Sequence, residues 1–177
     1  INGGSPVAEG VSGTIDMPGD VANWNGDLLV TGFTSSGTAA LYSVTPGSGS
    51  ATVLYSGAPL KEPLAVIYDA YDGSVYVADA RAEGGSIYQF DSAFTGASLV
   101  VTNAPSAFPG GLAITEGGSG TLFFPTVDSD VILTRSSAGI EEVLGVAGLN
   151  LGTGLAVYND TLYIGDAAGS ADIYQVS

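Results

Sequence analysis

Short apolar runs separated by polar turns recur along the whole chain. In the most regular series, large apolar residues alternate with smaller or polar ones, which is the two-residue period of a β-strand. Its four members are DLLVTG (27–32), SVYVAD (74–79), TLFFPT (121–126) and TLYIGD (161–166). No long segment has the 3.6-residue period of an amphipathic helix, so the sequence predicts an all-β protein.

Two further series of short apolar runs recur with a similar spacing. One precedes each member and reads DVANW, PLAVIY, GLAIT and GLAVY; the other follows and reads ALYSV, SIYQF, DVILT and DIYQV. Equivalent residues of the first series are 47, 47 and 40 positions apart: Leu28, Val75, Leu122 and Leu162. Those of the following series are 46, 44 and 42 apart: Leu41, Ile87, Val131 and Ile173. A period in the forties with about four strands per unit predicts a β-propeller of four blades.

A fourth, outer run closes the first three repeats and is missing from the last. It reads ATVLY, ASLVV and EEVLG, and the last repeat stops at Ser177 without one. Residues 6–10 precede the first inner run by the distance at which residues 97–101 precede the third, so we expect them to complete the final blade. The predicted blades are 18–62, 63–108, 109–151, and 152–177 together with 1–17, all in one domain.

Completion of the last blade by the N-terminal strand fits three assemblies. The strand can close a four-bladed ring within its own chain, and this is the arrangement that we expect first. Two chains can instead build one larger ring, or each strand can complete the blade of the next molecule and so grow a fibre. The chain can also be a piece of a longer propeller. Completion removes the exposed sheet edge that the last blade otherwise carries.

Composition narrows the list of partners. The 177 residues are 45% hydrophobic and 12% charged, the balance of a folded domain. Eighteen acidic residues against three basic ones give a net charge of −15, which repels nucleic acid and anionic membranes. No apolar run is long enough to span a bilayer. The chain begins at Ile1 rather than Met, which we interpret as removal of a secretory signal, with an extracellular or cell-surface location.

Three phrases resemble blades of the NHL-repeat and SMP-30/gluconolactonase-like propellers: PLAVIYDAYDGSVYVADA (63–80), GLAITEGGSGTLFF (111–124) and GLAVYNDTLYIGDA (154–167). The resemblance runs from about Pro18 to the end. It implies a metal at the propeller axis, held in the lactonase branch by an Asn or Asp just before the Gly-Leu of an inner strand. The matching positions are Gly19, Gly110 and Thr153, with Glu62 as the one carboxylate. One such ligand cannot hold a catalytic metal, so the lactonase activity is not expected.

Acidic residues are the main candidates for chemistry. The chain has no cysteine or histidine, which removes thiolate and imidazole metal sites and a Ser-His-Asp triad. Four carboxylates are predicted on one side of the propeller: Asp20, Glu62, Asp79 and Asp166. Together they could bind Ca²⁺ or supply an acid–base pair. The competing interpretation, which the repeats favour, is that each Asp caps its own turn or faces water.

Trp24 is the only tryptophan, and it stands between Asn23 and Asn25. An aromatic ring flanked by amides can stack on a sugar, whereas the common alternative is a packed core aromatic. Taken together, the sequence predicts a non-enzymatic extracellular interaction or structural module that self-assembles by strand exchange. The alternatives are an SMP-30/NHL-like hydrolase or lyase with an unusual metal site, and a carbohydrate-binding propeller that uses Trp24.

Overall fold

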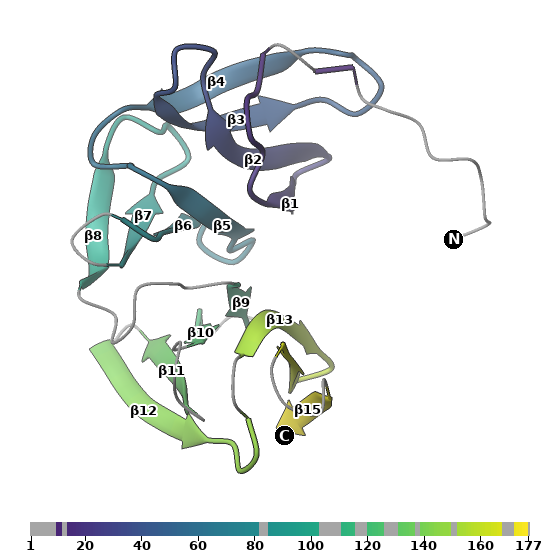
Figure 1. Ribbon diagram of the computed structural model, residues 1–177, viewed down its shortest axis with the longest axis vertical. Coiled ribbons are helices and arrows are strands. Elements are labelled where there is room, and N and C mark those ends of the chain that lie inside the picture. Colours follow the sequence, from purple (N-terminus) through teal and green to yellow (C-terminus); the bar gives the residue numbers. More distant parts are fainter. Residues whose placement is uncertain are drawn as a thin grey trace.

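Four antiparallel sheets make up the described part of the protein, and they follow one another around an open arc (Figure 1). The computed structural model describes residues 10–11, 14–81, 85–102, 111–115, 120–125, 131–136, 139–149, 152–167 and 172–176. These residues contain fifteen strands and no helix, and hence no helix that could cross a membrane. The prediction of an all-β architecture of four repeats is confirmed.

Each sheet is built from strands in chain order. Sheet 1 contains β1 (Val21–Trp24), β2 (Asp27–Phe33), β3 (Ala39–Val44) and β4 (Ala51–Ser56). Sheet 2 contains β5 (Pro63–Tyr68), β6 (Val75–Asp79), β7 (Ser86–Phe90) and β8 (Ala97–Thr102). Sheet 3 contains β9 (Ala113–Ile114), β10 (Leu122–Pro125), β11 (Val131–Ser136) and β12 (Gly139–Gly145). Sheet 4 contains β13 (Gly152–Tyr158), β14 (Thr161–Asp166) and β15 (Ile173–Val176).

The strand order gives every sheet an inner and an outer end. The first strands β1, β5, β9 and β13 lie toward the middle of the arc, and β4, β8 and β12 lie at its circumference (Figure 1). All four series of apolar runs read from the sequence coincide with strands. Each sheet falls within one of the predicted blades.

One equivalence read from the sequence is wrong by one residue. The strand register places Ile132 opposite Pro125, the position that Leu41, Ile87 and Ile173 occupy in the other sheets. The sequence comparison puts Val131 there. Three consecutive apolar residues, Val131 to Leu133, leave the alternation without a polar marker, so the pattern alone cannot fix this register.

The core consists of layers between neighbouring sheets. Because successive strand residues point to opposite faces, every sheet has a forward face, toward the sheet that follows it in the chain, and a backward face, toward the preceding one. Leu29 and Leu41 on the forward face of sheet 1 share a cluster with Val75 and Val77 on the backward face of sheet 2. The layers between sheets 2 and 3 and between sheets 3 and 4 repeat this arrangement.

The described part of the N-terminal segment packs on the backward face of sheet 1. Val11 and Ile15 contact a cluster that contains Val30, Ala40, Tyr42 and Val44. Asp16 pairs with Phe33 at the end of β2, with backbone N–H···O distances of 2.8 Å in both directions. The protein therefore anchors its N-terminal segment to sheet 1.

The self-closed ring that the sequence favours is not observed. Figure 1 shows the arc open between β13–β15 and β1–β4, and in the described residues no strand of sheet 4 pairs with sheet 1. The candidate outer strand, residues 6–10, lies outside the described residues except for Gly10. A Cβ placed on Gly10 would lie 3.7 Å from the Cα of Gly49, in the turn between β3 and β4. The contacts of Val11, Ile15 and Asp16 with sheet 1 thus hold this end of the candidate strand beside sheet 1.

Candidate functional site

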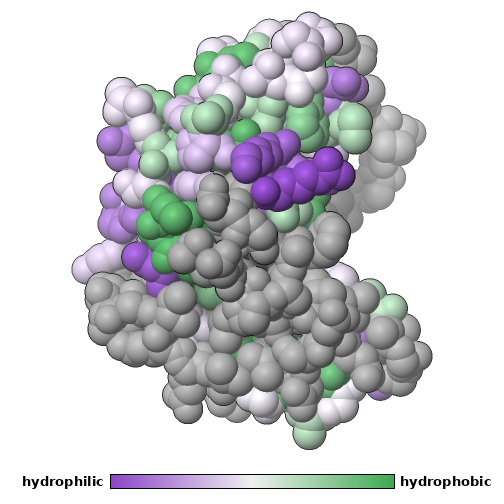
Figure 2. Space-filling view, turned by 60° about the vertical axis from the view of Figure 1, so that its left-hand side comes forward, coloured by the Kyte–Doolittle hydropathy of each residue, from purple (hydrophilic) through white to green (hydrophobic). Residues whose placement is uncertain are grey.

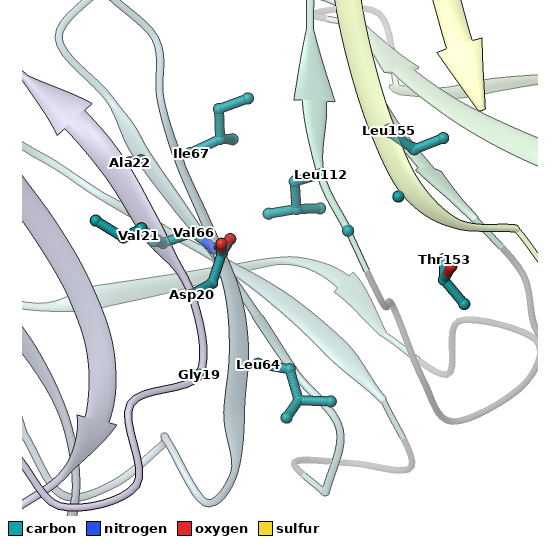
Figure 3. Close-up of a pocket in the computed structure, with 12 residues that line it drawn as sticks. Gly19, Asp20, Val21, Ala22, Leu64, Val66, Ile67, Leu112, Thr153 and Leu155 are labelled. Carbon is teal, nitrogen blue, oxygen red and sulfur yellow. Dashed lines mark hydrogen bonds between the residues drawn. The ribbon is translucent and has the colours of Figure 1, made fainter. Parts of the chain in front are cut away.

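The inner strands surround a hollow of about 360 Å³, which is within the size range of small-molecule pockets. Val21, Val66, Leu112 and Leu155 line it from the inner strands or just before them, and Figure 3 shows their side chains around the opening. Asp20 is the one charged side chain among the described residues that line the hollow. Thr153 adds one hydroxyl, and the other lining residues are apolar or glycine, so Asp20 and Thr153 supply the polar side chains of the hollow.

Asp20 connects two neighbouring sheets. Its Oδ2 accepts a hydrogen bond from the backbone N–H of Val66 at 3.0 Å, and Figure 3 shows the carboxyl group pointing at β5. Its own N–H donates to Oγ1 of Thr31 at 3.0 Å, and its carbonyl accepts from the N–H of Thr31 at 3.1 Å. One carboxylate oxygen is therefore committed to the contact between sheets 1 and 2.

Asp79 is fully buried and accepts three backbone hydrogen bonds. Oδ2 accepts from the N–H groups of Lys61 at 2.7 Å and Glu62 at 2.9 Å, and Oδ1 accepts from Arg81 at 3.0 Å. The carboxylate thus fixes the connection between sheets 1 and 2 to the end of β6. This is the turn-capping role of the competing interpretation.

The other two carboxylates occupy different surroundings. Glu62 forms an ion pair with the guanidinium of Arg81. Asp166 ends β14, as Asp79 ends β6, and is also buried; its backbone N–H donates to the carbonyl of Asp172 at 3.0 Å.

In the described ranges, no three acidic side chains gather as a metal site would require. Ca²⁺ takes six to eight oxygen ligands, and Asp79 already uses both its oxygens on backbone donors. Calcium binding by Asp20, Glu62, Asp79 and Asp166 stays a prediction, and the contacts of Asp20 and Asp79 favour structural roles.

Trp24 belongs to the layer between sheets 1 and 2. Its ring packs edge-to-face on Phe94, with centroids 5.5 Å apart and an interplanar angle of 84°. Asn25 takes a left-handed conformation (φ 53°) in the β1–β2 turn, and its Nδ2 donates to the hydroxyl of Tyr68 at 3.1 Å. Asn23 is exposed. Sugar binding by these residues stays a prediction, because the indole is already partly engaged by the core.

The sequence reasoning missed the forward face of sheet 4. The equivalent residues Leu41, Ile87 and Ile132 are each 0% exposed, whereas Ile173 is 77% exposed. Tyr158, the counterpart of Trp24 at the end of an inner strand, is 63% exposed. The apolar series contains the signal, but the exposure of its last member depends on whether another sheet follows.

Sheet 4 is also open at its outer edge. Sheets 1 to 3 each have four strands, and in the described residues sheet 4 has three, so β15 pairs with β14 alone. As far as the structure describes the chain, its open end therefore combines an exposed apolar residue, Ile173, with an unpaired edge of β15. Both features are typical of surfaces that receive another polypeptide segment.

No family model matches the sequence, and no curated protein is a significant sequence relative. Solved structures do match. A chain of the nidogen/laminin complex is similar, with a TM-score of 0.66 and 18% identity over 84% of this chain and 55% of that chain. A gluconolactonase from Xanthomonas campestris has a TM-score of 0.69 and 12% identity, over 91% of this chain and 57% of that chain. The calcium-binding protein regucalcin from Agrobacterium tumefaciens has a TM-score of 0.60 and 17% identity, over 83% of this chain and 52% of that chain.

The chain has the β-propeller fold. The resemblance to SMP-30/gluconolactonase-like propellers is thereby confirmed at the level of the fold. Identities below 20% carry no activity across, since one fold hosts many functions. The chain spans a little over half the length of these three proteins.

Proposed function

We propose that this protein is a non-enzymatic interaction module that assembles head to tail with further copies of itself. Residues 6–10 of one copy add as the outer strand beside β15 of the next. The observation that carries the proposal is the three-stranded sheet 4, whose outer edge is unpaired among the described residues. An added strand would satisfy the backbone groups along that edge.

The turn ahead of β1 supports this role for the N-terminal strand. Between β4 and β5, the N–H of Leu60 donates to the carbonyl of Gly57 at 3.0 Å, and Leu149 donates to Val146 at 3.0 Å between β12 and β13. Ahead of β1, the N–H of Thr14 donates to the carbonyl of Val11 at 3.1 Å. A turn closed by the same type of hydrogen bond thus precedes three inner strands, three residues before β5 and β13 and seven residues before β1.

In the two connections inside the chain, an outer strand ends directly before this turn. β4 ends at Ser56, one residue before Gly57, and β12 ends at Gly145, one residue before Val146. The residues up to Gly10 stand in the same relation to Val11. They therefore hold the sequence position of an outer strand that belongs to a sheet preceding sheet 1. Sheet 4 of another copy has no such strand in the part of the chain that the structure describes.

We place this module outside the cell or on its surface, where its strongly acidic composition would keep it soluble in salt. The complex of nidogen with laminin is an instance of this fold in a protein–protein assembly. The second candidate is a small-molecule hydrolase or lyase, which the hollow beside Asp20 favours. It predicts turnover that is lost in Asp20→Asn while the thermal unfolding midpoint stays close to that of the wild type.

The experiment that tests assembly is sedimentation velocity over a range of protein concentrations. We expect the full chain to form oligomers and a chain lacking residues 1–9 to sediment as a monomer with unchanged circular dichroism. A control chain in which a Gly/Ser stretch of equal length replaces residues 1–9 should also be monomeric. Equal masses for the full and the shortened chain would contradict strand exchange.

A further inference from the structure

We infer that the joint between copies is a fourth sheet–sheet layer, in which the forward face of sheet 4 packs against the backward face of sheet 1 of a second copy. The inference rests on the proposed self-assembly, and it adds a surface that strand exchange alone does not require. The strand edge and this face are separate features, so they can be tested separately.

The forward face of sheet 4 has the residue types of the three forward faces that are already covered. In the second strand of each sheet, the position is filled by Leu29, Tyr76, Phe123 and Tyr163. In the third strand it is filled by Leu41, Ile87, Ile132 and Ile173. The first three members of each set pack in a layer with the next sheet. Ile173 is exposed because no sheet follows it in the described residues.

The backward face of sheet 1 has the residue types of the faces that pack against a preceding sheet. Its apolar positions are Leu28, Val30, Tyr42 and Val44. The equivalent residues of sheet 2 are Val75, Val77, Tyr88 and Phe90, and those of sheet 4 are Leu162, Ile164, Tyr174 and Val176. Both of these sets pack against a preceding sheet, so the backward face of sheet 1 has the residue types of two established interfaces.

The connecting turns complete the match. Leu60 and Leu149, whose N–H groups close their turns, are buried between the two sheets that each turn connects. Ile15, one residue after the corresponding Thr14, is buried on sheet 1. Within the single chain Val11 and Ile15 pack on this face, and its residues Val30, Tyr42 and Val44 are already buried. Formation of the joint requires the segment ahead of Ile15 to leave its own copy, which is the movement that strand exchange demands. The occupant that fits is therefore a second copy of this chain.

The test is the variant Ile173→Asn, with Leu99→Asn as its matched control. Both residues are exposed in the single chain, at 77% and 48%, so neither substitution should lower the thermal stability of the monomer. Leu99 lies on β8, outside the joint; Figure 2 turns that side of the arc forward, where apolar residues form separate groups among polar ones. We expect self-association to weaken about tenfold or more in Ile173→Asn, and to stay at the wild-type value in Leu99→Asn.

A spin label gives a second readout. The chain contains no cysteine, so Ile173→Cys carries a single nitroxide. We expect its spectrum to change from mobile to immobilised as the full chain assembles, and to stay mobile in the chain lacking residues 1–9.

The outcomes separate this inference from the proposed function. If Ile173→Asn associates like the wild type and the label stays mobile, while the shortened chain is monomeric, strand exchange stands and the face-to-face layer is overturned. If the full chain is monomeric at every concentration, both are overturned. Immobilisation that requires a different added protein would also overturn the second copy as the occupant.

Discussion

Replacing Asp79 by alanine should destabilise the protein by about 3 kcal/mol. The carboxylate accepts hydrogen bonds from three backbone N–H groups. A hydrogen bond to a charged group contributes about 1.5–3 kcal/mol, and the cost of burying the charge offsets part of this, which leaves about 1 kcal/mol net for each bond. The cost per bond stays near this figure because Lys61 and Arg81 are exposed residues, whose freed N–H groups can reach water. For a chain of this length, about 3 kcal/mol corresponds to a fall in Tm of roughly 6–12 °C.

Urea unfolding followed by circular dichroism measures this loss. The matched control is Asp91→Ala, since Asp91 is exposed and accepts one local bond, from the N–H of Ala93 at 3.0 Å. We expect the control to lose under about 1 kcal/mol. The loss of stability in Asp79→Asn should lie between those in Asp79→Ala and Asp91→Ala. The amide keeps one acceptor oxygen, but its NH2 group cannot accept a hydrogen bond in place of the second carboxylate oxygen. Equal losses in Asp79→Ala and Asp91→Ala would refute the reasoning that Asp79 fixes the connection between sheets 1 and 2.

Three further predictions concern packing, pH and salt. Gly111→Ala should lower the free energy of unfolding by about 1–3 kcal/mol, because a Cβ would lie 2.7 Å from the carbonyl of Thr153, whereas Gly145→Ala, with open space around it, should not. Burial, followed by the charge of Asp72, raises the pKa of Tyr76. The unfolded chain therefore loses this proton first, and the free energy of unfolding should fall as the pH rises above about 10, less steeply in Tyr76→Phe. Self-association, measured by sedimentation, should strengthen between low and moderate NaCl, since each copy carries a net charge of −15; independence from salt would contradict this.

The positions of the strands could be predicted because the fold repeats one unit. Leu28, Val75, Leu122 and Leu162 recur at near-constant spacing, and each lies in the second strand of its sheet. The comparison of the repeats was wrong by one residue at Val131, because this residue and the next two are all apolar. Repetition therefore located the elements, and polar markers between them fixed their registers.

The contacts of the candidate site could be predicted only in part. Capping by Asp79 agrees with the turn-capping interpretation, because its donors lie in one short connection and near the end of its own strand. The bond from Val66 to Asp20 spans 46 residues and leaves no local trace in the sequence. The exposure of Ile173 could not be predicted either, because isoleucine is a residue type typical of buried positions. Its environment is set by the sheet that would lie beside it and not by its own segment.

An arc whose two ends differ gives any polymer of it a polarity. One terminus of the filament offers an unused strand and the other an unfilled edge, so the two tips should elongate at unequal rates. A subunit deprived of its first nine residues can no longer donate, yet its own β15 edge is intact. Such a subunit would act as a terminator at one tip alone, where it accepts the last strand and leaves nothing to offer in turn.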